Sequence, residues 1–275
     1  MKIALITDTH LAAIAPAFRS NCDAARDWVG TIGADITVHL GDITVDGSKY
    51  PEQLDYAREA FAGWPTPIRF VPGNHDIGDN IDPHAPHARH EPQVDSQRLA
   101  MYRNAFGQDR WSFQGDGWTV VGLNAQLFGA GDSEEVAQLA WLDETLAGVK
   151  GPLGLMLHKP LFRNGPSDTE RHHRYLPVEQ RLELARRLDA RDLRFVVCGH
   201  THQLRRIVVD GVEHVWAPST AFIIPNGMQE TIGEKIVGVL TLTLNAEGHQ
   251  FDYVEPAGMA RNDISRFVEL YPQLG

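Results

Sequence analysis

The sequence predicts an α/β fold that mixes parallel and antiparallel strands, on three observations. Short apolar runs alternate with helical patterns over the first 76 residues. The alternation resumes after a polar stretch and continues to about residue 198. Beyond it, Asp210-Gly211 separates two strand-like runs, which is a strong signal for an antiparallel hairpin. Because strands that alternate with helices favour a parallel sheet with right-handed crossovers, we expect strands of both kinds.

The first part of the chain predicts three strands and two helices. Apolar residues recur with helical spacing after Ser20, a candidate N-cap, and the pattern stops at Gly33. A second helical pattern stops at Gly63. In chain order we expect a strand at Lys2–Thr7, a helix at Ser20–Ile32, a strand at Asp35–Leu40, a helix at about Pro51–Ala62 and a strand at Ile68–Val71.

A polar stretch from Gly78 to Gln97 interrupts this rhythm. It is rich in Asp, Pro and His, which predicts a long loop that is either functional or mobile. After it, we expect helices at Ser96–Phe106, Glu134–Leu146 and Val178–Ala190, and strands at Trp118–Leu123, Leu153–Leu157 and Arg194–Cys198. Two hairpins follow, Leu204–Val209 with Val212–Trp216 and Lys235–Leu244 with His249–Val254.

No linker, repeat or low-complexity segment divides the chain. The sequence therefore predicts one domain over residues 1–255 and a tail at 256–275. The tail carries Phe267, Val268, Leu270 and Tyr271, which can pack on the domain or on a second subunit.

The composition excludes several classes of protein. The chain has 275 residues and a formal charge of −11, with no basic run, so we expect no stable binding to nucleic acid. No apolar run reaches the roughly 20 residues of a membrane span, and the run before Asp8 is short for a signal peptide. We therefore expect a cytoplasmic protein that does not contact a membrane. Cys22 and Cys198 lack metal-type spacing and are expected to be small buried side chains.

Histidine is unusually frequent, with 13 in an acidic chain, and metal-ligand residues follow five of the predicted strands. The carboxyl ends of strands are where open α/β sheets bind ligands, so these stretches should converge. Each has an alternative on its own, such as a turn with a capping Asp or a buried structural histidine. Their joint occurrence predicts a metal site. The stretches are Asp8-Thr9-His10, Gly41-Asp42, Gly73-Asn74-His75-Asp76, His158 and Gly199-His200-Thr201-His202.

In this order, the stretches resemble the motifs D-x-H, G-D, G-N-H-[DE], H and G-H-x-H of calcineurin-like metallophosphoesterases. The resemblance runs from Asp8 to His202 and no motif is missing. It implies a four-layer α/β fold in which two packed mixed β-sheets are flanked by helices. Among subfamilies, the chain is most similar to the cyclic nucleotide and glycerophosphodiester phosphodiesterases, because a short strand opens directly on Asp8-Thr9-His10 and the chain is compact.

The resemblance also implies a centre of two metal ions that share Asp42. One ion would be held by Asp8, His10, Asp42 and His202, and the other by Asp42, Asn74, His158 and His200. Carboxylate, imidazole and amide ligands suit divalent or trivalent Mn, Fe, Zn or Co. Such a pair lowers the pKa of a shared water, so that a metal-bound hydroxide attacks phosphorus.

His75 is assigned by the resemblance to the substrate, as a catalytic group that stabilises phosphoryl charge or protonates the leaving oxygen. Asn74 is expected to contact the substrate as well. The alternative for His75 is a structural hydrogen bond that orients its loop. Asp76 is expected to support that turn.

Other polar side chains form candidate rims. His84, His87 and His90 lie in the loop after Gly-Asn-His-Asp, as a lid or as solvated residues. A second set follows His158 and can contact phosphate or lie on the surface, and it comprises Arg163, Asn164, Arg171, His172 and His173.

The function that the resemblance favours is hydrolysis of a small anionic phosphodiester, such as a cyclic nucleotide or a glycerophosphodiester. A phosphomonoesterase or another phosphoester hydrolase on the same site is the first alternative. A noncatalytic scaffold with the same fold is a further alternative. A nuclease is disfavoured by the lack of a basic track, and a protein phosphatase by the lack of an extended recognition region. A homodimer is a family-based expectation.

Overall fold

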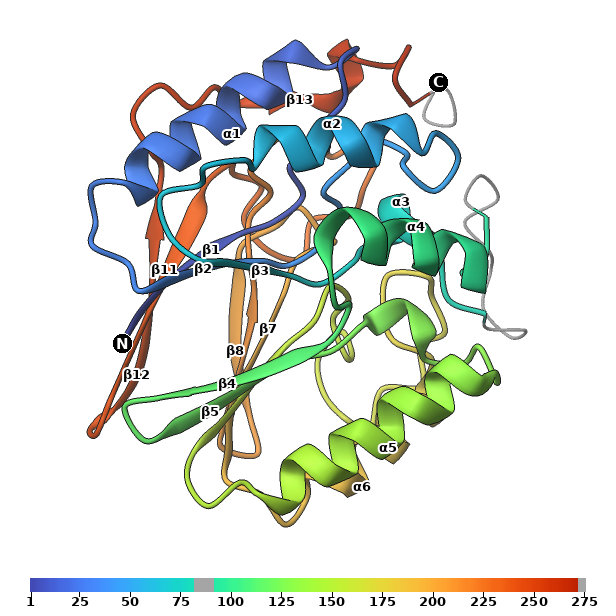
Figure 1. Cartoon of the computed structure of the whole chain (residues 1–275), viewed down its shortest axis with the longest axis vertical. Helices are drawn as coiled ribbons and strands as arrows, with labels where there is room; N and C mark the ends of the chain where they lie inside the picture. Colours follow the sequence, from blue (N-terminus) through green and yellow to red (C-terminus); the bar gives the residue numbers. More distant parts are fainter. Residues whose placement is uncertain (82–91, 272–275) are drawn as a thin grey trace.

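Two β-sheets packed face to face form the centre of the molecule in the computed structural model, which describes residues 1–81 and 92–271 (Figure 1). The first sheet has the strand order β12-β11-β1-β2-β3, and the second has the order β4-β5-β6-β7-β9-β8. A two-residue pair, β10 with β13, stands apart from both.

The first sheet has a parallel half and an antiparallel half. Strands β1 (Lys2–Ile6), β2 (Ile36–His39) and β3 (Ile68–Phe70) are parallel, as the alternation of strands and helices predicts. The hairpin of β11 (Val239–Asn245) and β12 (Gly248–Val254) adds to the outer side of β1, with Ile3 opposite Leu242.

The second sheet also combines parallel and antiparallel strands. Strands β5 (Trp118–Gly122), β6 (Leu153–Met156), β7 (Leu193–Cys198) and β9 (Val212–Trp216) run parallel. Antiparallel partners close its two edges, β4 (Trp111–Gly115) beside β5 and β8 (Arg205–Val209) beside β9. The predicted hairpin at Asp210-Gly211 is confirmed.

Alternation along the strands divides the core into layers. In β1, Ile3 and Leu5 face the space between the sheets, where they meet Phe195 and Val197 of β7. Ala4 and Ile6, which alternate with them, face the helices α1 (Pro16–Val29), α2 (Glu52–Ala60) and α4 (Ser96–Phe106). On the opposite side, α5 (Ser133–Ala147) and α6 (Val178–Leu188) cover the second sheet (Figure 1). The four-layer arrangement expected from the motifs is therefore confirmed.

Several predicted boundaries need correction. Helix α1 begins at Pro16, not at Ser20, because proline suits the first turn of a helix; the Ser20 hydroxyl donates to the Pro16 carbonyl from inside the helix. Strand β4 was not predicted, although Asp116-Gly117 joins it to β5 in a hairpin. Strand β11 begins at Val239, four residues later than expected. The short helices α3 (Asn74–Ile77), η1 (Ala125–Leu127) and η2 (Ile264–Arg266) were also not predicted.

The C-terminal tail packs on the same chain as far as residue 271. Strand β13 (Asn262–Asp263) pairs in parallel with β10 (Phe222–Ile223). The ring of Phe267 lies 4.9 Å from that of Phe18 in α1, and Tyr271 is buried in the same apolar cluster. The buried amide of Asn21 fixes this arrangement, because it donates to carbonyl oxygens of residues 220, 221 and 260.

Both cysteines are free and buried, as predicted. Cys22 packs in the core between the first sheet and its helices, and Cys198 packs beside Tyr175 and Trp216. None of the helices in the described part of the chain has the length and apolarity of a membrane-spanning segment.

Candidate metal centre

The five sequence stretches that carry metal-ligand residues meet at one place in the fold. The first three follow β1, β2 and β3 of one sheet, and the other two follow β6 and β7 of the other sheet. They bring together two groups of side chains whose ligand atoms lie within 4.8 Å of one another. We call Asp8, His10 and His202 the first cluster, and Asp42, His158 and His200 the second cluster. The expected convergence is therefore seen, with both sheets contributing.

In the first cluster, three side chains from distant parts of the sequence bring their ligand atoms together. His202 Nε2 lies 3.3 Å from Asp8 Oδ1 and 3.3 Å from His10 Nε2. All three residues are buried.

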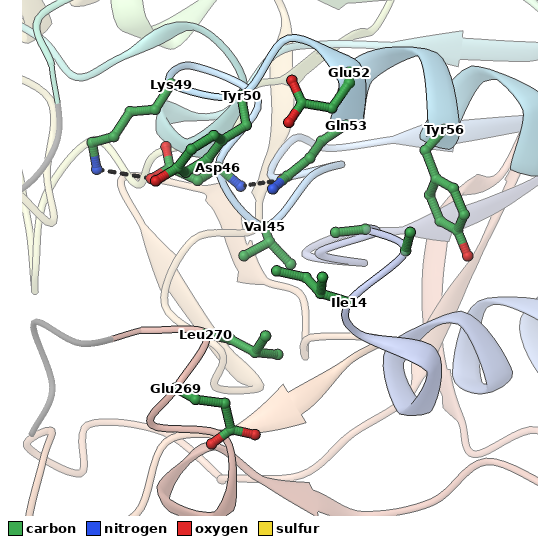
Figure 2. Close-up of a pocket in the computed structure, with 12 residues that line it drawn as sticks. Ile14, Val45, Asp46, Lys49, Tyr50, Glu52, Gln53, Tyr56, Glu269 and Leu270 are labelled. Atoms are coloured by element: carbon green, nitrogen blue, oxygen red, sulfur yellow. Dashed lines mark hydrogen bonds and ion pairs between the residues drawn. The ribbon is translucent and has the colours of Figure 1, made fainter.

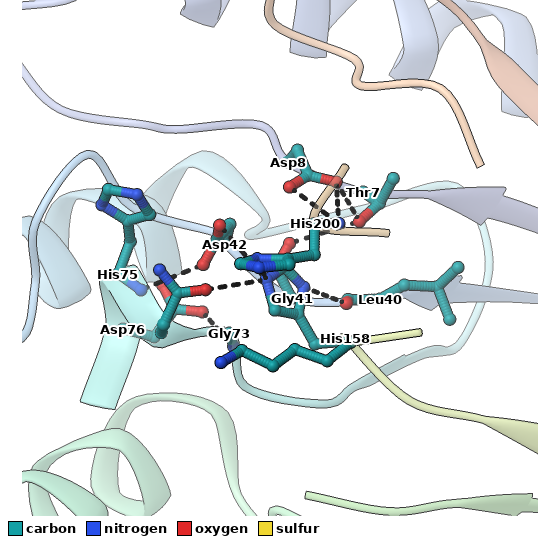
Figure 3. Close-up of polar contacts among 12 residues, drawn as sticks. Thr7, Asp8, Leu40, Gly41, Asp42, Gly73, His75, Asp76, His158 and His200 are labelled. Carbon is teal, nitrogen blue, oxygen red and sulfur yellow. Dashed lines mark hydrogen bonds and ion pairs between the residues drawn. The ribbon is translucent and has the colours of Figure 1, made fainter. Parts of the chain in front are cut away.

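The second cluster is centred on His158. Its Nε2 lies 3.2 Å from Asp42 Oδ2 and 3.2 Å from His200 Nδ1. Asn74 Oδ1 also lies 3.2 Å from this atom, so the amide expected beside the second ion joins the cluster. Figure 3 shows Asp42 between His75 on one side and the His158–His200 pair on the other.

Hydrogen bonds of the backbone link the two clusters. The His10 N–H donates to the Asp42 carbonyl over 3.1 Å, and the His200 N–H donates to the Asp8 carboxylate over 3.1 Å. Each cluster is therefore held partly by a residue of the other, and the two form one centre.

The backbone at this centre is in an uncommon conformation. Of the seven non-glycine residues with positive φ in the described part of the chain, five belong to the clusters. These five are Asp8, His10, Asp42, His200 and His202, with φ between 45° and 68°. Asp and His tolerate this left-handed region better than most residues, at a cost of about 1 kcal/mol or more. Such outliers gather at functional sites, where the surrounding structure holds them in place.

Two glycines allow the chain segments to approach closely. A Cβ on Gly73 would overlap the carboxylate and backbone nitrogen of Asp42, and a Cβ on Gly199 would overlap the side chains of Thr7 and Asp8. The glycines of Gly-Asn-His-Asp and Gly-His-Thr-His are thus required because a ligand carboxylate occupies the space of their side chains.

The donor atoms of both clusters fit a cation. His202 Nδ1 lies 3.1 Å from the Phe222 carbonyl and His158 Nδ1 lies 2.8 Å from the Leu40 carbonyl. Because a carbonyl oxygen only accepts, each Nδ1 carries a proton, so Nε2 is the nitrogen with which each ring can bind a cation. In both clusters this Nε2 faces carboxylate oxygens and other nitrogens. Metal ions would supply the positive charge that these atoms attract.

Electrostatics at the second cluster agree with this conclusion. Burial favours the neutral ring of His158, but the carboxylates of Asp42 and Asp8 outweigh it and raise the pKa of His158 to about 9. Burial acts against ionised Asp42 too, yet the charges of His158 and His75 hold the pKa of this carboxyl well below its usual range. Burial and then neighbouring histidines lower the pKa values of His10 and His200. The centre therefore keeps Asp42 ionised and attracts positive charge.

His75 lies at the outer side of the first cluster. Its backbone N–H donates to Asp42 Oδ1 over 3.0 Å, and its ring lies 4.9 Å from that of His10 in an edge-to-face contact. Asp76 accepts bonds from the backbone of Gly73, Ile43 and Thr44 and from the Thr44 hydroxyl. It thereby ties the loop after Asp42 to the loop after β3, which is the supporting role expected of it.

Of the residues predicted to form rims, the structure describes only the set that follows His158. His84, His87 and His90 lie outside the described residues. Arg163 pairs with Glu230, Arg171 pairs with Glu179, and the Asn164 side chain accepts from Arg205. The rings of His172 and His173 lie 4.1 Å apart in the same loop. Arg163 and Arg171 are thus each paired with a carboxylate.

Three residues near the centre escaped the sequence prediction. Lys159 is almost fully buried beside His158 and forms an ion pair with Asp79. Phe222 packs its ring on His10 and His202, at centroid distances of 4.8 and 4.5 Å. Tyr271 lies with its hydroxyl 2.8 Å from His10 Nδ1. A lysine next to a strand-end histidine was a detectable signal for the first, whereas the other two depend on long-range packing.

A pocket of about 470 Å³ is lined by segments that follow two of the cluster residues in the sequence (Figure 2). Its walls are residues 12–14, which follow His10, seven residues between 45 and 56, which follow Asp42, and Glu269 with Leu270 of the tail. None of the cluster residues is among those that line it. The pocket is therefore not the place where the ligand atoms meet.

Known proteins are similar to this chain in sequence or in fold. The glycerophosphodiester phosphodiesterase GpdQ of Enterobacter lignolyticus is 25% identical over 256 residues, which cover 84% of this chain and 81% of the relative. A dimetal phosphatase from Danio rerio has a TM-score of 0.64 at 13% identity and covers 94% of this chain and 99% of its own. A purple acid phosphatase from yellow lupin seeds has a TM-score of 0.66 at 15% identity and covers 96% of this chain and 52% of its own. The two structures share the fold of this chain.

A family model also matches this chain. The model of the calcineurin-like phosphoesterases matches residues 1–204, a span that contains both clusters and Asn74. This match confirms the family expected from the motifs. The chain belongs to the calcineurin-like phosphoesterase family and is a hydrolase of phosphoesters.

Proposed function

We propose that the protein is a binuclear metal-dependent phosphodiesterase that hydrolyses a small phosphodiester, such as a cyclic nucleotide or a glycerophosphodiester. The observation that carries this proposal is the pair of adjacent clusters, in each of which the ligand atoms lie within 4.8 Å of one another. The first cluster with Asp42 would hold one ion, and the second cluster with Asn74 would hold the other. Asp42 would be a ligand of both.

The ligand chemistry indicates which ions suit the centre. Imidazole nitrogens dominate, with two carboxylates and one amide oxygen, a mixture that favours Mn, Fe, Zn or Co over Mg or Ca. When bound, two such ions supply positive charge to phosphoryl oxygens and make water a better nucleophile.

His75 is the group that we assign to the leaving alcohol. Hydrolysis of a diester forms a bond from phosphorus to a water oxygen and breaks the bond from phosphorus to one alcohol oxygen, which needs a proton. The backbone of His75 is fixed by Asp42 and its ring lies beside His10, so an imidazolium there can donate that proton. Asn74, which precedes it, lies at the second cluster and can also contact the substrate.

Two observations favour a diester over a monoester. The first is the likeness to GpdQ, a glycerophosphodiester phosphodiesterase, over most of both chains. The second is charge: a diester carries one negative charge and a monoester carries up to two. Lys159, Arg163 and Arg171, which could have matched an additional negative charge, are each already paired with a carboxylate.

The test begins with protein purified without a chelator. Its metal content is measured, and initial rates are then compared on bis(p-nitrophenyl) phosphate, p-nitrophenyl phosphate and a cyclic nucleotide. We expect two ions per chain and a diester rate above the monoester rate. Asp42→Asn should lose both activity and metal, whereas Asp252→Asn, which changes an exposed carboxylate of β12, should resemble the unchanged protein.

Each alternative has its own outcome. A monoester rate far above the diester rate would replace the proposal with a phosphomonoesterase. Two bound ions with no hydrolysis of any of the three substrates would favour the noncatalytic scaffold. Failure to bind metal at all would remove the basis of the proposal.

A further inference from the structure

The C-terminal tail reaches the metal centre through Tyr271. Its side chain is buried, and its hydroxyl oxygen lies 2.8 Å from His10 Nδ1. The Tyr271 ring also meets the rings of His75 and Phe222 edge-on, at centroid distances of 5.9 and 5.7 Å. His10 thus directs Nε2 into the first cluster while its other nitrogen contacts a residue 261 positions later in the chain.

The second imidazole of the first cluster depends on the tail less directly. His202 Nδ1 donates to the carbonyl of Phe222, and the Phe222 ring packs on both histidines of the cluster. Phe222 lies in β10, whose strand partner is β13 in the tail. Both imidazoles of the first cluster are therefore oriented by residues that the tail contacts or supplies.

The second cluster has a different support. His158 Nδ1 donates to the carbonyl of Leu40, a residue buried between the two sheets. Figure 3 shows this bond on the side of His158 away from Asp42. Nothing in this support involves residues 256–271, so a change at Tyr271 should affect the two clusters unequally.

We propose that Tyr271 is a positioning residue for the ion held by the first cluster. When His10 Nε2 binds a metal, Nδ1 must carry the ring proton, and it then donates to the Tyr271 oxygen. This bond fixes both the tautomer and the orientation of the ring. The inference rests on the metal centre proposed above and adds the tail to it.

The magnitude follows from how such partners act in other metal sites. Loss of the group that orients a ligating histidine typically lowers metal affinity by about 10- to 100-fold. We expect Tyr271→Phe to weaken one of two binding steps by this factor and to leave the other unchanged. Phenylalanine keeps the ring contacts with His75 and Phe222, so the hydroxyl is the group removed.

The experiment is a titration of the metal-free protein with Co²⁺, followed by calorimetry and by visible absorption. The matched control is Tyr253→Phe, which removes a hydroxyl that donates to the Val237 carbonyl over 2.8 Å, away from the clusters. The unchanged protein and the control should bind two ions with the same affinities. In Tyr271→Phe, one step should keep its affinity and the other should weaken.

A second measurement separates positioning from general loosening of the tail. In the Zn²⁺-loaded protein with ¹⁵N-labelled histidine, the Nδ1–H signal of His10 should move on Tyr271→Phe, while that of His158 should stay. Unfolding temperatures of the metal-free variants should agree within a few degrees.

The outcomes separate this inference from the proposed function. If the unchanged protein binds no metal, the proposed centre itself fails. If it binds two ions and Tyr271→Phe binds both equally well, the centre stands and the role of Tyr271 is refuted. Equal weakening of both steps would also refute it, because the Nδ1 atoms of His10 and His158 have separate partners.

Discussion

A single methyl group at Gly73 should disable the centre without unfolding the protein. Position 73 precedes Asn74 and lies against Asp42, the carboxylate assigned to both ions. A Cβ there would overlap Asp42 Oδ1 and the Asp42 backbone nitrogen, and would lie 2.8 Å from Asp42 Cγ. Gly73→Ala therefore forces Asp42 and the loop after β3 apart.

The size of the effect follows from these contacts. Non-bonded carbon atoms rest about 3.5 to 4.0 Å apart, so the two segments must separate by about 1 Å. Asp42 cannot move alone, because Oδ1 accepts from the His75 N–H and Oδ2 lies 3.2 Å from His158 Nε2. A misplacement of about 1 Å at a reacting centre can reduce the rate by about 100-fold. We expect kcat/KM on a diester to fall by about that factor.

The assay compares initial rates and circular dichroism of the variant with those of Gly148→Ala. Gly148 ends helix α5 far from the clusters, has ordinary helical angles, and its added Cβ would meet its nearest atom at 3.6 Å. The control should keep full activity. Gly73→Ala with a native spectrum and a kcat/KM within about threefold of the unchanged protein would show that the site tolerates the shift, and would refute the reasoning.

Three further predictions concern catalysis, metal and pH. His75→Ala should keep both ions but lower kcat on an alkyl diester by about 10² to 10⁴, since an alkoxide needs its proton; full activity on that ester would exclude the acid role. Removal of metal with a chelator should lower the unfolding temperature, because an ion at 100 times its Kd adds about 2.7 kcal/mol, and an unchanged melting curve would count against bound ions. Burial lowers the pKa of His214 from 6.5 to about 4, so the unfolded chain binds the proton first. Stability should therefore fall by up to about 3 kcal/mol between pH 6.5 and 4, and urea unfolding of His214→Leu should show a shallower fall. The same slope in both proteins would exclude His214 as the cause.

The order of strands and helices was predictable where local patterns are strong. The alternation up to Ile68 and the Asp210-Gly211 turn are local signals, and the structure has the strands and the hairpin that they predict. The turn Asp116-Gly117 carries the same signal, but β4 before it has a short, half-polar pattern and was missed. Strands β10 and β13 have two residues each and exist only as partners, so no local pattern can predict them.

The centre was more predictable than the fold around it. Its proposed ligands are polar residues directly after apolar runs, and the chemistry of metal binding restricts which residues can occupy those positions. The supporting contacts are different in kind. Tyr271 is one of several apolar residues in the tail, and only the folded chain shows that its hydroxyl meets His10. Lys159 and Asp79 similarly become a buried pair through contact across 80 positions.

The strained backbone explains why the ligands are spread over the whole chain. Five ligand residues in the left-handed region cost about 1 kcal/mol or more each, and the sum rivals the 5 to 15 kcal/mol that stabilises a typical domain. A short peptide could not hold such a centre, because it has no buried surface to offset that cost. Here each ligand follows a strand whose apolar side chains are fixed between layers, as Ile6 precedes Asp8 and Cys198 precedes His200. The two packed sheets therefore act as the rigid support that holds the donor atoms of both clusters close together, where metal ions can bind them.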